Sequence, residues 1–167
     1  MDTVDTRVAD PIELARRNWV EAGWGDAADG MAFVTSLVRA QQLLLGRIEE
    51  LLRPHGLTFA RFEVLRLLAF SRQGVLPVGK VGERLQVHPA SVTNAVQRLE
   101  DAGLVVRSAN PADGRSVLAA ITPAGRRLVE ACTELLNREV FGPLPIDPAD
   151  RDAATAALRS LRRGLGD

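Results

Sequence analysis

The chain has 167 residues, a length that favours one compact domain or one core with an added oligomerisation region. Hydrophobic residues make up 46% and charged residues 25%, which is typical of a globular protein and excludes a disordered or collagen-like chain. No apolar run reaches the ~18 residues of a membrane span, and the acidic first ten residues lack the basic start of a secretory signal. We therefore expect a cytoplasmic protein with no membrane partner.

Few residues are available for catalysis or metal binding. The single cysteine, Cys132, excludes an internal disulfide and any multi-cysteine metal site. The chain has only two histidines, so few side chains are available for acid–base catalysis. The sequence has no paired catalytic carboxylates, no nucleophile–histidine set and no glycine-rich phosphate loop. We therefore expect neither an enzyme nor a protein with a metal or an organic cofactor.

The formal net charge is zero, but the charges are unevenly distributed. Residues 1–30 carry three basic and seven acidic side chains, whereas residues 31–83 carry seven and four, and residues 84–127 carry six and three. Contact with phosphate depends on the field within about a Debye length, so the basic middle of the chain can bind DNA although the whole chain is neutral.

Apolar spacing and capping signals predict mainly helices. Asp10-Pro11 starts the first helix and Gly23 ends it; the second begins after Asp29 and stops at Pro54. The later predicted helices follow in chain order: from Thr58 past Ala69, 77–85, 89–102, 122–141 and 147–165.

The pattern changes from helical to strand-like after residue 103. Residues 104–109 and 116–121 flank a loop with an Asp113-Gly114 turn signal, which predicts a β-hairpin directly behind the helix at 89–102. The predicted fold is mostly α, a winged helix-turn-helix core with a two-stranded β-wing and N- and C-terminal dimerisation helices. The predicted divisions are an N-terminal extension helix (1–29), a helical dimerisation region (30–56 and 123–167) and a DNA-binding region (57–122).

The helix at 89–102 has one apolar side and one polar side. Polar side chains can hydrogen-bond base edges or phosphates in the major groove, and asparagine, glutamine and arginine can do so with two bonds. The predicted readers are Ser91, Thr93, Asn94, Gln97 and Arg98. The other interpretation is an ordinary solvated face, and the hairpin behind the helix favours groove reading.

The hairpin supplies a second set of candidate DNA contacts. Arg115 follows the turn, where its long cation could enter the narrow minor groove. Asp113 could brace Arg115 by an ion pair, and Arg107 on the first strand could touch phosphate or pack along the sheet. A solvated turn arginine is the alternative for Arg115.

Three stretches together resemble the MarR family of bacterial transcriptional regulators. They are LTFARFEVLRLL (57–68), VGKVGERLQVHPASVTNAVQRLEDAGLVVR (78–107), and the wing DGR (113–115) followed by ITPAGRRL (121–128). The resemblance implies a homodimer that binds a pseudo-palindromic operator and is released by a small ligand. It also places the five helix residues in the major groove and Arg115 in the minor groove. His88 departs from the Ser or Thr that is usual at the recognition-helix cap.

The apolar residues favour a dimer independently of the family. A winged core needs only residues from about 57 to 121, so the long amphipathic helices at both ends retain apolar stripes that this core cannot cover. A two-fold dimer would place two recognition helices about 34–36 Å apart, which matches successive major grooves.

The N-terminal helix and the start of the core are the candidate effector region. Trp19 could anchor the helix to the dimer, or it could wall a pocket for a small aromatic or phenolic effector with Phe62 and Glu63. A tryptophan-bearing N-terminal helix resembles the urate-responsive subgroup of the family, although Glu63 and Ala95 replace the aspartate and arginine of that subgroup.

Two further expectations concern regulation and function. Cys132 lies on the apolar stripe of a later helix without a neighbouring histidine, so we expect a buried packing role and not a reactive thiol. We expect a ligand-responsive, DNA-binding transcriptional regulator that acts as a repressor. The alternative is a winged-helix module that contacts another protein through the same polar surface.

Overall fold

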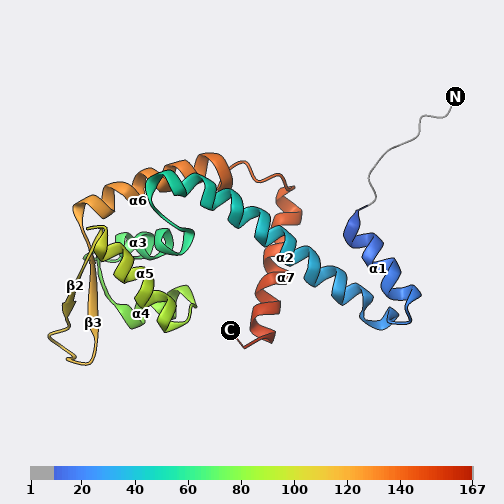
Figure 1. Ribbon diagram of the computed structural model, residues 1–167, viewed down its shortest axis with the longest axis horizontal. Coiled ribbons are helices and arrows are strands. Elements are labelled where there is room, and N and C mark those ends of the chain that lie inside the picture. The colour runs from blue at the N-terminus through green and yellow to red at the C-terminus, as the bar shows by residue number, and fades with distance from the viewer. Residues whose placement is uncertain (1–9, 167) are drawn as a thin grey trace. The chain divides into compact units, whose positions relative to one another are not determined.

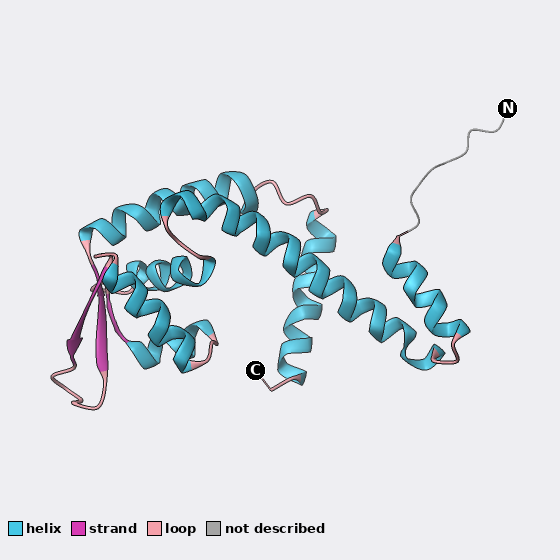
Figure 2. Cartoon of the chain, in the orientation of Figure 1, coloured by secondary structure: helices cyan, strands magenta, loops and turns pink. Residues whose placement is uncertain are grey.

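The computed structural model describes residues 10–166, and in this range the chain is mainly helical with one small sheet (Figure 2). The helices are α1 (Pro11–Glu21), α2 (Gly25–Leu52), α3 (Phe59–Phe70), α4 (Val78–Leu85), α5 (Pro89–Asp101), α6 (Pro123–Leu136) and α7 (Pro148–Gly164). A 3-10 turn (Arg53–His55) follows α2, and a π-helical turn (Asn137–Phe141) follows α6. The strands are β1 (Val75–Pro77), β2 (Val105–Ala109) and β3 (Val117–Ile121). The mostly helical, winged fold class is confirmed.

The chain divides into two compact units, residues 1–47 and 48–167. In the N-terminal unit, the Asp10 side chain accepts a hydrogen bond of 3.0 Å from the Ile12 N–H, which caps α1 as the sequence predicts. Arg16 pairs with Glu13 at 2.8 Å and with Asp29 of α2 at 3.3 Å. The hydrogen bond from Arg16 lowers the pKa of Glu13 to about 2.

The predicted start of the second helix is wrong. Helix α2 begins at Gly25, four residues before the expected signal at Asp29. Gly23 adopts a φ of +90° and completes the turn out of α1, so the chain re-enters a helix at once. Gly30 then lies inside α2, where a glycine costs only about 1 kcal/mol relative to alanine.

The C-terminal unit carries the winged core (Figure 1). Thr58 caps α3 by accepting a 3.3 Å hydrogen bond from the Arg61 N–H, and α3 buries its apolar side. The core joins apolar side chains from the end of α2, the residue before α3, α3, α4, α5, the sheet, α6 and the π-helical turn: Ile48, Leu52, Leu57, Phe62, Val64, Leu65, Leu68, Val81, Val92, Val96, Leu99, Val105, Ala119, Val129, Cys132, Leu136 and Val140. This core holds α5 against α3 and α4.

The sheet has three antiparallel strands in the order β1-β3-β2, so the predicted two-stranded wing is incomplete. Strands β2 and β3 pair as expected, with Val105 opposite Ile121 and Ala109 opposite Val117. The missed strand β1 has only three residues, too few for an alternating pattern, and it ends at Pro77 on the sheet edge. Its place in the sheet comes from pairing with β3, which no local signal encodes.

The sheet is tied to α6 by one close approach. Thr122 caps α6 by accepting from the Gly125 N–H at 3.0 Å, and its own N–H donates to the Leu104 carbonyl at 3.0 Å. A Cβ atom at residue 125 would lie 2.2 Å from that carbonyl oxygen, so glycine is required here. Helix α6 ends at Leu136, and the segment expected to continue it to Phe141 is the π-helical turn.

Three helices, α1, α2 and α7, keep many of their apolar side chains exposed. Neither α1 nor α7 has a buried residue, and α2 exposes Leu43 to 69%. The other exposed large apolar residues of α1, α2 and the α1–α2 turn are Leu14, Val20, Trp24, Phe33, Val34, Val38 and Leu44. No helix within residues 10–166 combines the length and the apolarity that crossing a membrane requires.

Candidate nucleic-acid interface

Helix α5 is fixed at its start by two local features. The turn before it places Gln86 in the left-handed region, with a φ of 55°. His88 then caps α5, because its Nδ1 accepts a 3.2 Å hydrogen bond from the Ala90 N–H. The unusual histidine therefore does provide the cap that a Ser or Thr would provide.

The two sides of α5 differ as the sequence predicts. Val92, Val96 and Leu99 are buried, which fixes the rotation of the helix. Four of the five predicted readers, Ser91, Thr93, Asn94 and Arg98, are exposed on the other side.

The fifth predicted reader, Gln97, is held by two neighbours. Its Nε2 donates to the Asp101 carboxylate at 2.8 Å, and its Oε1 accepts from the guanidinium of Arg107. Both ends of the amide are thus engaged within the protein.

Arg107 links the wing to the recognition helix. Its Nε pairs with Glu100 Oε2 at 2.7 Å, and its backbone N–H donates to Glu100 Oε1 at 3.1 Å. Both side chains are about two-thirds buried, with exposures of 32% and 30%. This Arg107–Glu100–Gln97 network, named here the wing lock, joins β2 to the last two turns of α5.

The predicted ion pair between Asp113 and Arg115 is not what braces the wing tip. The Asp113 carboxylate accepts from the backbone N–H of Arg115 at 3.1 Å, which is an Asx turn. Asn110 adds bonds from its Nδ2 to Ser116 Oγ at 2.7 Å and from the Ala112 N–H to its Oδ1 at 3.1 Å. An aspartate two residues before an exposed arginine satisfies the backbone of the turn more readily than it reaches the guanidinium.

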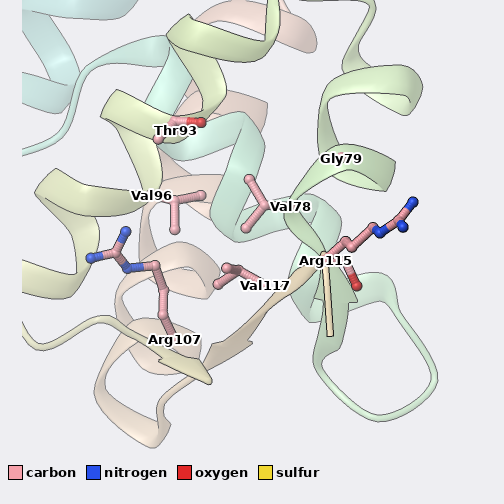
Figure 3. Close-up of a pocket in the computed structure, with 8 residues that line it drawn as sticks. Val78, Gly79, Thr93, Val96, Arg107, Arg115 and Val117 are labelled. Carbon is pink, nitrogen blue, oxygen red and sulfur yellow. The ribbon is translucent and has the colours of Figure 1, made fainter. Parts of the chain in front are cut away.

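A cavity of about 300 Å³ lies between α4, α5 and the wing, lined on one side by Val78 and Val117 (Figure 3). In this view, Arg107 points towards α5 and Arg115 points away from it. The two wing arginines therefore occupy different environments: one is bonded to a carboxylate, and the other has an exposed guanidinium with no carboxylate partner among residues 10–166.

Two of the three predicted effector residues lie on α3. Phe62 is 5% exposed and Glu63 is half-buried. Both border an open apolar groove of about 270 Å³, which the rings of Phe59, Phe70 and Phe141 also line. Burial raises the pKa of the Glu63 carboxyl. The third, Trp19, belongs to the N-terminal unit, where its ring meets Trp24 edge to face with centroids 5.2 Å apart.

Cys132 is fully buried in the core, and burial raises the pKa of its thiol. The predicted packing role is confirmed.

Sequence reasoning missed two contributors to this surface. Glu100 was not singled out, because its role depends on how β2 packs on α5. Arg61 of α3 also borders this surface, where it lines a groove with Ser91, Asn94 and Arg98, and its Nε donates to the Thr58 hydroxyl at 3.1 Å.

The helix, turn, helix and wing, with a polar helix face left exposed, define a winged helix-turn-helix protein. Residues 55–116 match the model of the MarR family. The crystal structure of Sco5413, a MarR family transcriptional regulator from Streptomyces coelicolor, is 50% identical, with a TM-score of 0.75, and the match covers 83% of this chain and 96% of that one. The chain belongs to the MarR family of transcriptional regulators.

Two further relatives are similar over shorter stretches. The structure of BpsR from Bordetella bronchiseptica is 32% identical, with a TM-score of 0.65 and coverage of 77% of this chain and 91% of that one; its DNA binding is regulated by 6-hydroxynicotinic acid. The HTH-type transcriptional repressor Rv2887 of Mycobacterium tuberculosis is 34% identical over 94 residues, which are 56% of this chain and 66%, just under two thirds, of the repressor. The family consists of regulators and not enzymes, which confirms that prediction.

Proposed function

We propose that the protein is a transcriptional repressor that binds a pseudo-palindromic operator as a homodimer and releases it when a small aromatic effector binds. The observation that carries the DNA-binding part is the exposed face of α5, where Ser91, Asn94 and Arg98 point away from the core beside a wing whose Arg115 is exposed. Hydrogen-bonding side chains on one helix face, next to a cationic hairpin, suit a major groove and its neighbouring minor groove.

Exposed apolar side chains on the helices at both ends of the chain support the homodimer. Helices α1 and α7 bury nothing within the chain, and α2 exposes a series of large apolar residues. On a globular protein, an exposed apolar surface that runs along several helices marks an interaction site. A second copy of the chain is the occupant that also provides two recognition helices for a two-fold operator.

Repression and effector response are supported by the relatives. Rv2887 is named a transcriptional repressor, and BpsR is regulated by an aromatic acid. In this chain, the groove beside Phe62 and Glu63 has aromatic walls, which suit a ring-shaped ligand. An effector that binds more tightly to a non-binding form would lower DNA affinity by that difference.

Fluorescence anisotropy with labelled duplexes from the DNA flanking the gene tests this proposal. We expect tight binding that weakens steeply with salt, with a log–log slope of roughly −0.9 for each phosphate neutralised. We also expect at least one member of a panel of aromatic acids and phenols to release the DNA. Salt-insensitive binding, or none, would instead favour the winged-helix protein–protein module.

A further inference from the structure

A shallow groove of about 370 Å³ lies between the first turn of α3 and the exposed face of α5. Thr58 and Arg61 line it from α3, and Ser91, Asn94 and Arg98 line it from α5. Because the α5 residues belong to the predicted DNA-reading face, the groove opens on the same side of the molecule.

The guanidinium of Arg61 is held in place without being neutralised. Its Nε donates to the Thr58 hydroxyl at 3.1 Å, and its backbone N–H donates to the same oxygen at 3.3 Å. This anchor leaves the two terminal amino groups for a ligand, and no carboxylate pairs with Arg61 among residues 10–166. A fixed guanidinium at a helix N-terminus, where the helix dipole is positive, suits an anion.

Two other arginines near this face are bound by side chains of the protein itself. Arg107 is neutralised by Glu100 in the wing lock. Arg66 of α3 donates to the Thr133 hydroxyl at 3.3 Å and stacks 4.1 Å above the Phe70 ring. Arg61 and Arg98 thus remain as cations on the two sides of one groove, each without an acid within the described part of the chain.

We propose that this groove receives the sugar–phosphate backbone of DNA and that Arg61 binds a phosphate there. The proposal rests on the proposed function and adds α3 to the DNA surface. Phosphate contacts set the register of a protein on the duplex and carry no sequence information, whereas base contacts carry it. Arg61 is therefore a positioning contact that holds Asn94 and Ser91 over the base edges.

The test measures the salt dependence of DNA binding by the full-length protein and by Arg61→Gln. The probes are a labelled duplex selected from the gene's flanking DNA and a labelled duplex of random sequence. We expect Arg61→Gln to make the log–log slope shallower by roughly two per dimer, about 0.9 for each of two phosphates, on both duplexes alike. Arg127→Gln, which removes the same charge from an exposed position on α6, is the matched control and should change the slope by less than half of that.

Three outcomes would overturn the proposal. The first is a slope for Arg61→Gln equal to that of Arg127→Gln while the unmodified protein binds normally. The second is a changed base preference in Arg61→Gln, which would make Arg61 a base reader. The third concerns Arg61→Lys, since a phosphate contact tolerates lysine in part. If Arg61→Gln loses DNA binding and Arg61→Lys restores neither the affinity nor the slope, although both variants melt like the unmodified protein, Arg61 does not bind a phosphate. If the unmodified protein binds no duplex, the proposed function itself fails, and that result is distinct from the other three.

Discussion

The same substitution, glycine to alanine, should have opposite effects on stability at two helical positions. At Gly125 a Cβ would lie 2.2 Å from the Leu104 carbonyl oxygen and 3.0 Å from Ile121 Cγ1. An ordinary carbon–oxygen contact needs about 3.3 Å, so α6 and the residue that leads into β2 would have to separate by about 1 Å. At Gly79 of α4, a Cβ would meet nothing within 4 Å.

These contacts set the expected magnitudes. Overpacking costs up to about 3 kcal/mol, and the better helix propensity of alanine returns about 1 kcal/mol, so Gly125→Ala should lower the free energy of unfolding by about 2 kcal/mol. Gly79→Ala keeps only the gain of about 1 kcal/mol. Thermal melts at one fixed protein concentration should therefore show Tm lowered by about 4–8 °C for Gly125→Ala and raised by about 2–4 °C for Gly79→Ala. A Tm for Gly125→Ala that is unchanged or raised would contradict the close approach of α6 to Leu104, and a lowered Tm for Gly79→Ala would contradict the open space at that position.

Three other experiments, with four substitutions, test the wing lock, the Glu63 carboxyl and the wing tip. A double-mutant cycle with Glu100→Gln and Arg107→Met should give a coupling free energy of about 1 kcal/mol in urea unfolding, because the pair is charged, hydrogen-bonded and two-thirds buried. A coupling free energy near zero would show that the wing lock does not stabilise the fold. Glu63→Gln should raise the urea midpoint at about pH 8. The raised pKa of Glu63 makes its charged form unfavourable in the folded protein, so this gain should shrink as pH falls through that pKa, and a gain that grows at low pH would contradict the assignment. Arg115→Ala should weaken DNA binding and make the salt slope shallower by roughly two per dimer without lowering Tm, since the side chain is exposed; unchanged affinity would show that the wing tip does not contact DNA.

Local signals predicted most of the winged core. Pro89 and Gly103 bracket α5, and Asp113-Gly114 marks the hairpin, because proline, glycine and turn aspartates restrict the backbone by themselves. The strand β1 escaped prediction because its three residues gain their structure from pairing with β3.

Side-chain partners were harder to predict than helices and strands. Alternation along β2 gives the side of the sheet on which Arg107 lies, but its bond to Glu100 depends on how β2 packs against α5. For the same reason the sequence could not show that Gln97 is engaged at both ends of its amide. The prediction that Gln97 reads bases stays a prediction, and it requires the wing lock to open on DNA.

In the proposed complex, α5 and the wing of both protomers contact DNA together. A hydroxyl-radical footprint on the selected duplex, compared with that of Asn94→Ala, shows whether both protomers make this contact. We expect two protected half-sites whose centres are about 10 base pairs apart or a multiple of that spacing, with both half-sites weakened equally by Asn94→Ala. A single protected stretch, or a footprint that Asn94→Ala leaves unchanged, would contradict it.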